Sequence, residues 1–226
     1  MRQPRSGRAA GGIRGVAGAM IALACLAAAA GARAEIVDRV LATVGARVIT
    51  LSDLRAAETF GLVPAGMPTG TPAETLDSLV DRTLMYGEVE RFVAPEPDRA
   101  AVDRRMAQIR AAFPTAAAYE QALAWTAMTD ERLRSAVAGN LQIEAYIEQR
   151  FGETGQPTAD EVQRYYADHP AEFTRAGRLL PLSEVRALAE ARVVADRRQT
   201  LVRQWLERLR RGTHVEVNTA ALAGLK

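Results

Sequence analysis

The two histidines and pairs of acids close together in the sequence are candidates for acid–base chemistry in this chain. His169 stands at the expected end of a helix, and His214 begins a short segment of β-forming residues. General acid–base catalysis needs groups held together within reach of a substrate. The acid spacing instead places both pairs on solvated helix faces or helix starts: Glu88/Glu90 and Asp160/Glu161. The sequence therefore predicts no catalytic residue among them.

Other kinds of site lack the residues that they need. The single cysteine, Cys25, lies in the N-terminal segment, so residues after it have no thiol for a disulfide, a nucleophile or a metal. Two histidines without cysteine make a zinc site a poor expectation. The sequence contains no HExxH, GxxxxGK[ST], GxGxxG or GxSxG motif. We expect no enzyme activity, no cofactor and no metal.

The positive signal comes from apolar side chains near a Gly/Pro-rich loop at residues 61–70. Methionine and aromatic side chains re-pack at little cost, which suits a surface that binds polypeptide without strict shape specificity. The candidate binding residues are Phe60, Leu62, Met67, Phe113, Trp125 and Met128. The alternative for Phe113 and Trp125 is an ordinary core position, and Met67 could be exposed or buried.

Residues 1–34 have the pattern of a secretory signal peptide. Four arginines without an acid precede an apolar stretch at residues 16–30, which is short for a membrane span. Ala32-Arg33-Ala34 is a small-x-small cleavage site, so we expect cleavage after Ala34 and a periplasmic chain without a membrane span. The alternatives are an uncleaved anchor or lipidation at Cys25.

Cleavage would change the sign of the net charge. The whole chain carries 29 basic and 27 acidic residues, a net charge of +2. The leader holds five of the basic residues and none of the acids, so 24 basic residues would remain against 27 acids, a net charge of −3. A nucleic-acid partner is therefore not expected.

The segment after the leader predicts a β-hairpin followed by a helix. β-forming residues at 36–44 lead to a turn at Gly45-Ala46-Arg47, and residues 48–50 return. Ser52 is expected as the cap of the following helix, with Asp53 in its first turn.

Helices dominate the rest of the chain. The helix starts are marked by Thr71, Asp98, Thr129 and Thr158, each followed by apolar residues at helical spacing. Thr158 and Glu161 have the spacing of a capping box, and Pro72 fits the first position of the helix after Thr71. The expected helices are 72–92, 98–113, a short helix after Pro114, 129–151, 158–169 and 184–211. Ser183 is the expected cap of the last, arginine-rich helix, whose charges form either a solvated face or an anion- or lipid-binding patch.

A single short strand, residues 214–217, follows the last helix. One strand needs a partner, and the hairpin is the only other expected β structure. We therefore predict a mostly α-helical fold with a small N-terminal β-hairpin that the C-terminal strand joins. Gly212 is expected as the residue that ends the last helix.

The order of these elements resembles the SurA-like periplasmic chaperones. IVDRVLATVGARVITLSDL at 36–54 and ETLDSLVDRTLMYGEVER at 74–91 resemble the start and the central helix of their N-terminal domain. TADEVQRYYADHPAEF at 158–173 resembles the segment before the isomerase module in SurA, PrsA, PpiD and trigger factor relatives. Residues 183–217 are similar to the helix and strand that follow that module.

The resemblance implies domains at 35–151 (chaperone domain), 152–182 (satellite helix and connector) and 183–226 (returning helix and strand). The connector is too short to hold the parvulin isomerase module that many relatives carry there. The resemblance thus implies an ATP-independent holdase for unfolded periplasmic or outer-membrane proteins, without isomerase activity. The alternatives are a dedicated subunit of one envelope complex and a peptidyl-prolyl isomerase.

Overall fold

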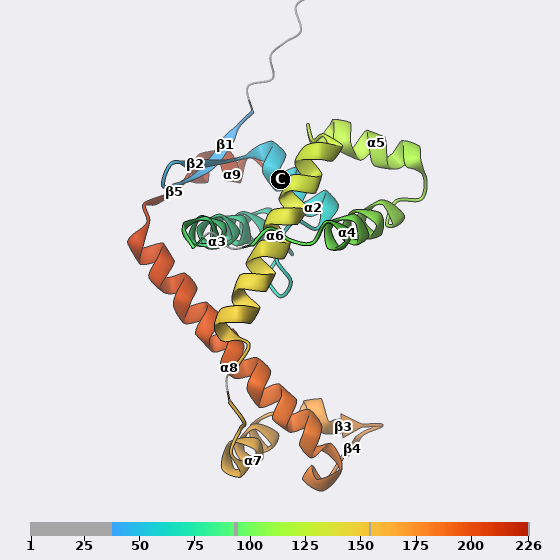
Figure 1. The fold of residues 1–226 in the computed structure, drawn as a ribbon, viewed down its shortest axis with the longest axis vertical. Coiled ribbons are helices and arrows are strands. Elements are labelled where there is room, and N and C mark those ends of the chain that lie inside the picture. Colours follow the sequence, from blue (N-terminus) through green and yellow to red (C-terminus); the bar gives the residue numbers. More distant parts are fainter. Residues whose placement is uncertain (1–37, 93–94, 154, 226) are drawn as a thin grey trace, which may run out of the picture. The chain divides into compact units, whose positions relative to one another are not determined.

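The computed structural model describes residues 38–92, 95–153 and 155–225. The predicted signal peptide and its cleavage site lie outside these ranges. The mostly α-helical fold with a small N-terminal hairpin is confirmed (Figure 1).

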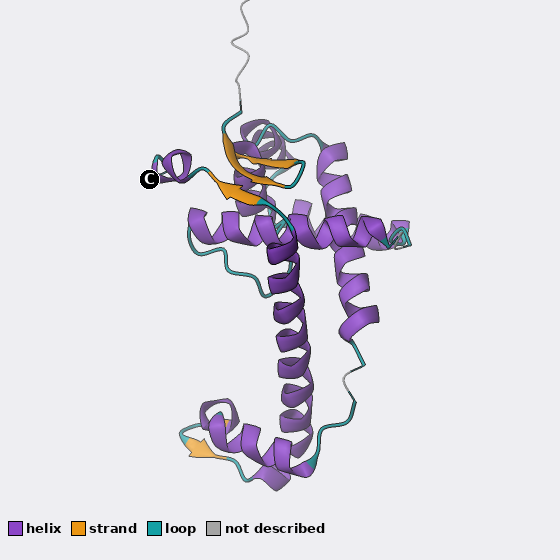
Figure 2. Ribbon diagram, turned by 90° about the vertical axis from the view of Figure 1, so that its left-hand side faces the viewer, coloured by secondary structure: helices purple, strands orange, loops and turns teal. Residues whose placement is uncertain are grey.

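The two ends of the described chain meet in one antiparallel sheet. Strand β1 (Val40–Val44) pairs with β2 (Arg47–Thr50), and β5 (Val215–Val217) pairs with the other edge of β1 (Figure 2). The order β2-β1-β5 confirms the prediction that the C-terminal strand joins the hairpin. Gly45 turns the chain with a φ of 59°, a conformation that favours glycine, and its N–H donates to the His214 carbonyl.

Helix α2 (Leu51–Phe60) follows the hairpin directly, and its cap is not the predicted one. The Thr50 hydroxyl accepts from the Asp53 N–H, and the Asp53 carboxylate accepts from the Thr50 N–H, which completes a capping box. The prediction of Ser52 as the cap is therefore wrong. Ser52 lies inside the helix and donates its hydroxyl to the Asp38 carboxylate.

Four further helices build the body, each capped by a threonine or an aspartate side chain. They are α3 (Pro72–Arg91), α4 (Arg99–Ala111), α5 (Ala116–Trp125) and α6 (Asp130–Phe151). The predicted caps Thr71, Asp98 and Thr129 are confirmed. Helix α3 contributes buried residues to two neighbouring parts of the core, such as Val80 in one and Met85 in the other. It contacts α2, α6, α8 and the sheet, as expected of a central helix.

A smaller group of elements follows residue 155. Helix α7 (Ala159–Asp168) begins at a Thr158–Glu161 capping box, as predicted, and leads into a 3-10 turn at Pro170–Phe173. The predicted connector contains a hairpin that the sequence did not indicate, with strands β3 (Thr174–Arg175) and β4 (Arg178–Leu179). We call residues 158–194 the satellite.

Helix α8 (Leu182–Gly212) packs on both groups of elements. Its first half packs Val185, Ala189 and Val193 against Val162 and Phe173 of the satellite. Its last turns place Trp205 and Leu206 among residues of α3 and α6, where both side chains are buried.

The ends of α8 differ from the prediction. The residue before the helix is Pro181, so Ser183 lies in the first turn and is not the cap. Gly212 belongs to the helix, and extended Thr213 follows it. A short helix that the sequence did not indicate, α9 (Thr219–Ala223), comes after β5 and is capped by Asn218.

Several arginines of α8 form ion pairs with neighbouring elements. The pairs join Arg192 to Glu172, Arg197 to Glu161, Arg198 to Glu148, and Arg210 to Asp77 and Asp81. These pairs use much of the basic charge for contacts between elements, which weakens the alternative of an anion-binding patch. Within the described part of the chain, no helix has both the length and the apolar character of a membrane-spanning segment.

Candidate functional site

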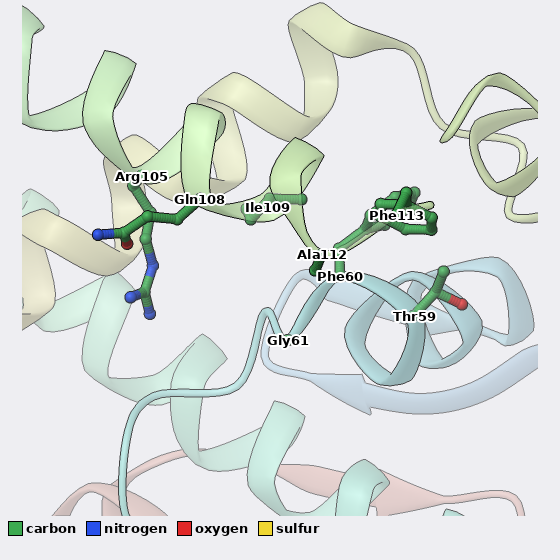
Figure 3. Close-up of a pocket in the computed structure, with 8 residues that line it drawn as sticks. All are labelled: Thr59, Phe60, Gly61, Arg105, Gln108, Ile109, Ala112 and Phe113. Carbon is green, nitrogen blue, oxygen red and sulfur yellow. The ribbon is translucent and has the colours of Figure 1, made fainter. Parts of the chain in front are cut away.

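A groove lies between the C-terminal end of α2 and helix α4, with a volume of about 440 Å³ (Figure 3). Its lining residues are Thr59, Phe60, Gly61, Arg105, Gln108, Ile109, Ala112 and Phe113. Phe60 and Phe113 lie at one end with ring centroids 5.8 Å apart, while Arg105 and Gln108 lie toward the other end. The groove thus offers apolar surface along most of its wall and one cation.

Two of the predicted binding residues form this aromatic end, but they differ in exposure. Phe60 is 5% exposed and belongs to the core, so it offers little accessible surface. Phe113 is half-buried and packs against the same core. Its side chain is therefore the larger aromatic surface that the groove offers to a ligand.

Tyr119 of α5 completes the aromatic cluster and ties it to α6. Its ring lies edge-on to Phe113, with centroids 5.6 Å apart, and its hydroxyl donates to Asp130 at 2.6 Å. Arg110 of α4 donates to the same carboxylate at 2.5 Å, so one acid braces three helices. These bonds lower the pKa of Asp130, and burial together with Asp130 raises the pKa of Tyr119.

Trp125 lies at the end of α5 and is 64% exposed. The alternative that placed it in the core is therefore wrong. The Arg55 guanidinium of α2 lies over its ring, 4.6 Å from the centroid, which is a cation–π geometry. This contact holds a large aromatic surface in a defined orientation at the protein surface.

The loop at residues 61–70 connects α2 to α3 and carries Met67. Its side chain is half-buried and packs against the Met85–Trp205 part of the core. Ser78 of α3 donates to the Pro68 carbonyl at 2.7 Å, which anchors the loop. Met67 also lines a small cavity of about 280 Å³ together with other loop residues.

Leu62 and Met128 line a separate cavity of about 340 Å³, which is bordered by β2, α2, α3 and α6. Leu62 is 5% exposed and is a core residue, while Met128 is half-buried. The structure therefore brings Phe60 together with Phe113 and Leu62 together with Met128. It gives Met67 and Trp125 separate surroundings. Phe60 and Leu62 do not form an open contact surface in this conformation, and this part of the prediction is corrected.

Arg55, Arg105, Gln108 and Ile109 were not among the predicted binding residues. Ile109 and Phe113 are four residues apart at the end of α4, which is a signal for one shared helix face. Arg55, Arg105 and Gln108 have no comparable signal in the sequence. The helix packing brings Arg55 of α2 beside α5, and Arg105 and Gln108 of α4 beside the end of α2.

The histidines lie outside this groove. His169 stacks on Tyr165 at the end of α7, with ring centroids 4.0 Å apart, so its predicted place at a helix end is confirmed. His214 is exposed and immediately precedes β5. Across residues 38–92, 95–153 and 155–225, no three histidine, aspartate or glutamate side chains are grouped as metal ligands would be.

Comparison with known proteins adds no family to this description. No protein-family model matches the sequence, and a search of curated proteins finds no match. A function for the chain has to be inferred from its sequence pattern and from the groove.

Proposed function

We propose that this chain is an exported, ATP-independent chaperone that holds unfolded envelope proteins, including precursors of outer-membrane β-barrels. It would act in the periplasm after removal of residues 1–34 and would have no isomerase activity. The sequence resemblance to SurA-like chaperones suggests this role, and the groove between α2 and α4 suggests where an unfolded chain would bind.

The observation that carries the proposal is the accessible aromatic surface that Phe113 and Trp125 offer at the ends of α4 and α5. Phe113 is partly accessible in an open groove, and Trp125 is 64% exposed nearby on the same set of helices. An aromatic side chain that remains accessible offers apolar surface, and burying this surface against a client is favourable. Aromatic and apolar walls also accept many different side chains, which suits unfolded clients of varied sequence.

Weak binding is consistent with such a groove. Burying one large apolar side chain contributes about 1.5–3 kcal/mol, so two or three contacts contribute roughly 3–9 kcal/mol, and the cost of association offsets most of this gain. A client with several apolar segments would bind several chaperone molecules in turn or together. Release then needs no nucleotide, because folding of the client competes with each weak contact.

The path of the chain also supports the resemblance. Helix α8 and strand β5 return to the hairpin, as the order of segments in that family implies. The link from Phe173 to Leu182 is only the β3–β4 hairpin, which supports a chain without an isomerase module.

Aggregation of an unfolded client tests the proposal. A urea-unfolded outer-membrane β-barrel protein is diluted with and without residues 35–226, and light scattering is followed over time. We expect suppression at a few-fold molar excess and a prolyl isomerisation rate equal to the uncatalysed rate on the same preparation.

Matched variants locate the activity. Trp125→Ala and Phe113→Ala should each weaken suppression, whereas Leu188→Ala removes an exposed leucine of α8 in the satellite and should not. Circular dichroism checks that each variant is folded. Unchanged aggregation with the unmodified protein would contradict the proposal, and a pull-down from envelope extract would then test the alternative of a single dedicated partner.

A further inference from the structure

Arg82 of α3 differs from several arginines that stabilise the body. Those arginines pair with carboxylates: Arg47 with Glu90, Arg110 with Asp130, Arg134 with Asp103, and Arg210 with Asp77 and Asp81. Arg82 donates instead to two neutral oxygens, Asn140 Oδ1 at 2.5 Å and the Ala136 carbonyl at 3.1 Å. Among the residues that the structure describes, no carboxylate forms an ion pair with it.

The surroundings of Arg82 fix its guanidinium in place. Asn140 accepts from Arg82 Nε and donates its own amide to the Leu62 carbonyl at 3.0 Å, so its orientation is set from both sides. Arg82 Nη2 is held by the α6 backbone, while Nη1 has no hydrogen-bond acceptor among the described residues. A rigidly held guanidinium with unused N–H groups is well suited to a carboxylate, which accepts two parallel hydrogen bonds.

Arg82 lines the cavity of about 340 Å³ that Leu62 and Met128 also line. Apolar residues such as Val48, Ile49 and Leu79 supply about half of the remaining accessible lining, and polar groups supply the rest. The volume lies at the lower end of the range of small-ligand sites, and the lining offers an apolar part beside polar groups.

Two other charged residues, Asp53 and Arg47, also contribute to the net charge around this cavity. Asp53 lines it, but its carboxylate accepts from the Thr50 N–H and hydroxyl, and Arg47 is paired with Glu90. Burial lowers the pKa of Arg82, while Tyr86 and Asp53 partly offset that effect. A bound anion stabilises a partly buried cation that has no paired acid more than it stabilises an exposed cation, because water screens the charges less.

We propose that the cavity between β2, α2, α3 and α6 is a carboxylate-binding site, in which Arg82 binds a carboxylate of a polypeptide while the apolar walls bind an adjoining aliphatic side chain. The carboxylate would come from a chain terminus or from an acidic side chain. This inference rests on the proposed function only in taking the ligand to be an unfolded polypeptide.

Fluorescence anisotropy with three labelled hexapeptides of the same leucine- and serine-rich sequence tests the site. One ends in a free carboxylate, one is amidated, and one is amidated but has an internal glutamate. We expect the amidated peptide to bind about 10-fold more weakly than at least one of the others, as the loss of a charged hydrogen bond predicts. Whichever acid-bearing peptide binds tightly identifies the source of the carboxylate.

Three variants separate binding from structure. Arg82→Gln should remove the preference for a carboxylate, and Arg91→Gln, an exposed arginine on the same helix, should keep it. Because Arg82→Gln could also disturb packing, Asp53→Asn provides a second test. It removes the competing negative charge and should tighten carboxylate binding several-fold, an effect that a purely structural role does not produce.

Equal binding of all three peptides to the unmodified protein, or a carboxylate preference that neither Arg82→Gln nor Asp53→Asn changes, would overturn the inference. The light-scattering assay separates this failure from that of the proposed function. Suppressed aggregation without a carboxylate preference would reject only the Arg82 site. A carboxylate preference without suppression would reject only the holdase function.

Discussion

The body and the satellite are stabilised in different ways. The body packs five helices and a three-stranded sheet around a large apolar core, and strand β5 joins both ends of the described chain in that sheet. The satellite buries a much smaller cluster: Val162, Phe173, Val185, Ala189 and Val193. Ion pairs from α8, Arg192 to Glu172 and Arg197 to Glu161, add to this small core.

This difference suggests a division of roles. The cavities described above and the exposed Trp125 all belong to the body, whose core is large enough to support them. The satellite has little apolar area to bury, so its stability should be lower and more sensitive to charge. We therefore expect the body to bind clients and the satellite to open independently of it.

Phe173→Ala should have the largest effect, which we expect on the stability of the satellite. The side chain is 1% exposed, and its ring centroid lies 5.1 Å from that of Tyr166. Truncating such a buried ring to alanine lowers the free energy of unfolding by about 3–5 kcal/mol. Hydrogen exchange should show loss of protection in α7 but unchanged protection in α3 and α6. Equal loss in the body would show that the two regions unfold as one unit.

Tyr119→Phe should have an intermediate effect, on the body alone. It removes the donor to Asp130 but keeps the ring against Phe113, so the free energy of unfolding should fall by about 1 kcal/mol. Urea denaturation measures this change. We also expect faster hydrogen exchange in α5 and weaker suppression of aggregation, whereas the mirror variant Tyr165→Phe in the satellite should leave suppression unchanged.

Trp125→Ala should change stability by no more than about 0.5 kcal/mol, because the side chain is mostly exposed. Its effect on aggregation should nevertheless exceed that of Tyr119→Phe. A large drop in melting temperature would instead indicate that Trp125 has a structural role.

The smallest effect should be the pH response of the satellite. Hydrogen bonds from Thr158, together with Arg197, lower the pKa of Glu161 from 4.5 to about 2. The ionised form is therefore favoured in the folded state, and this contribution is present above pH 4.5 and is lost as the pH falls toward 2. Methyl NMR signals of Val162 should report the loosening over that range, and Glu161→Gln should flatten the response. The same response in Glu161→Gln would contradict this assignment.

Local signals in the sequence predicted most of the helix starts. Thr71, Thr129 and Thr158 are caps because each precedes a helical apolar pattern. The prediction failed at Ser52 because the cap is Thr50, two residues earlier, which forms a capping box with Asp53. This T-x-x-D signal is present in the sequence. At Ser183 the helix begins earlier, after Pro181.

Features that depend on packing or unusual backbone could not be predicted in this way. The β3–β4 turn needs a positive φ at Ala176, which is uncommon for alanine, so the hairpin left no strong signal. Composition alone favours tryptophan as a core residue, yet Trp125 is exposed and held by Arg55 from another helix. The groove itself exists only because α4 packs beside the end of α2.

Site-specific photo-crosslinking tests the central claim most directly. A photoreactive amino acid is placed at Trp125 in one protein and at Leu188 in another, and each is irradiated during suppression of outer-membrane protein aggregation. Strong crosslinks to the client from position 125 and few from position 188 would establish that the body holds the unfolded chain. Equal yields, or a higher yield from position 188, would contradict the account.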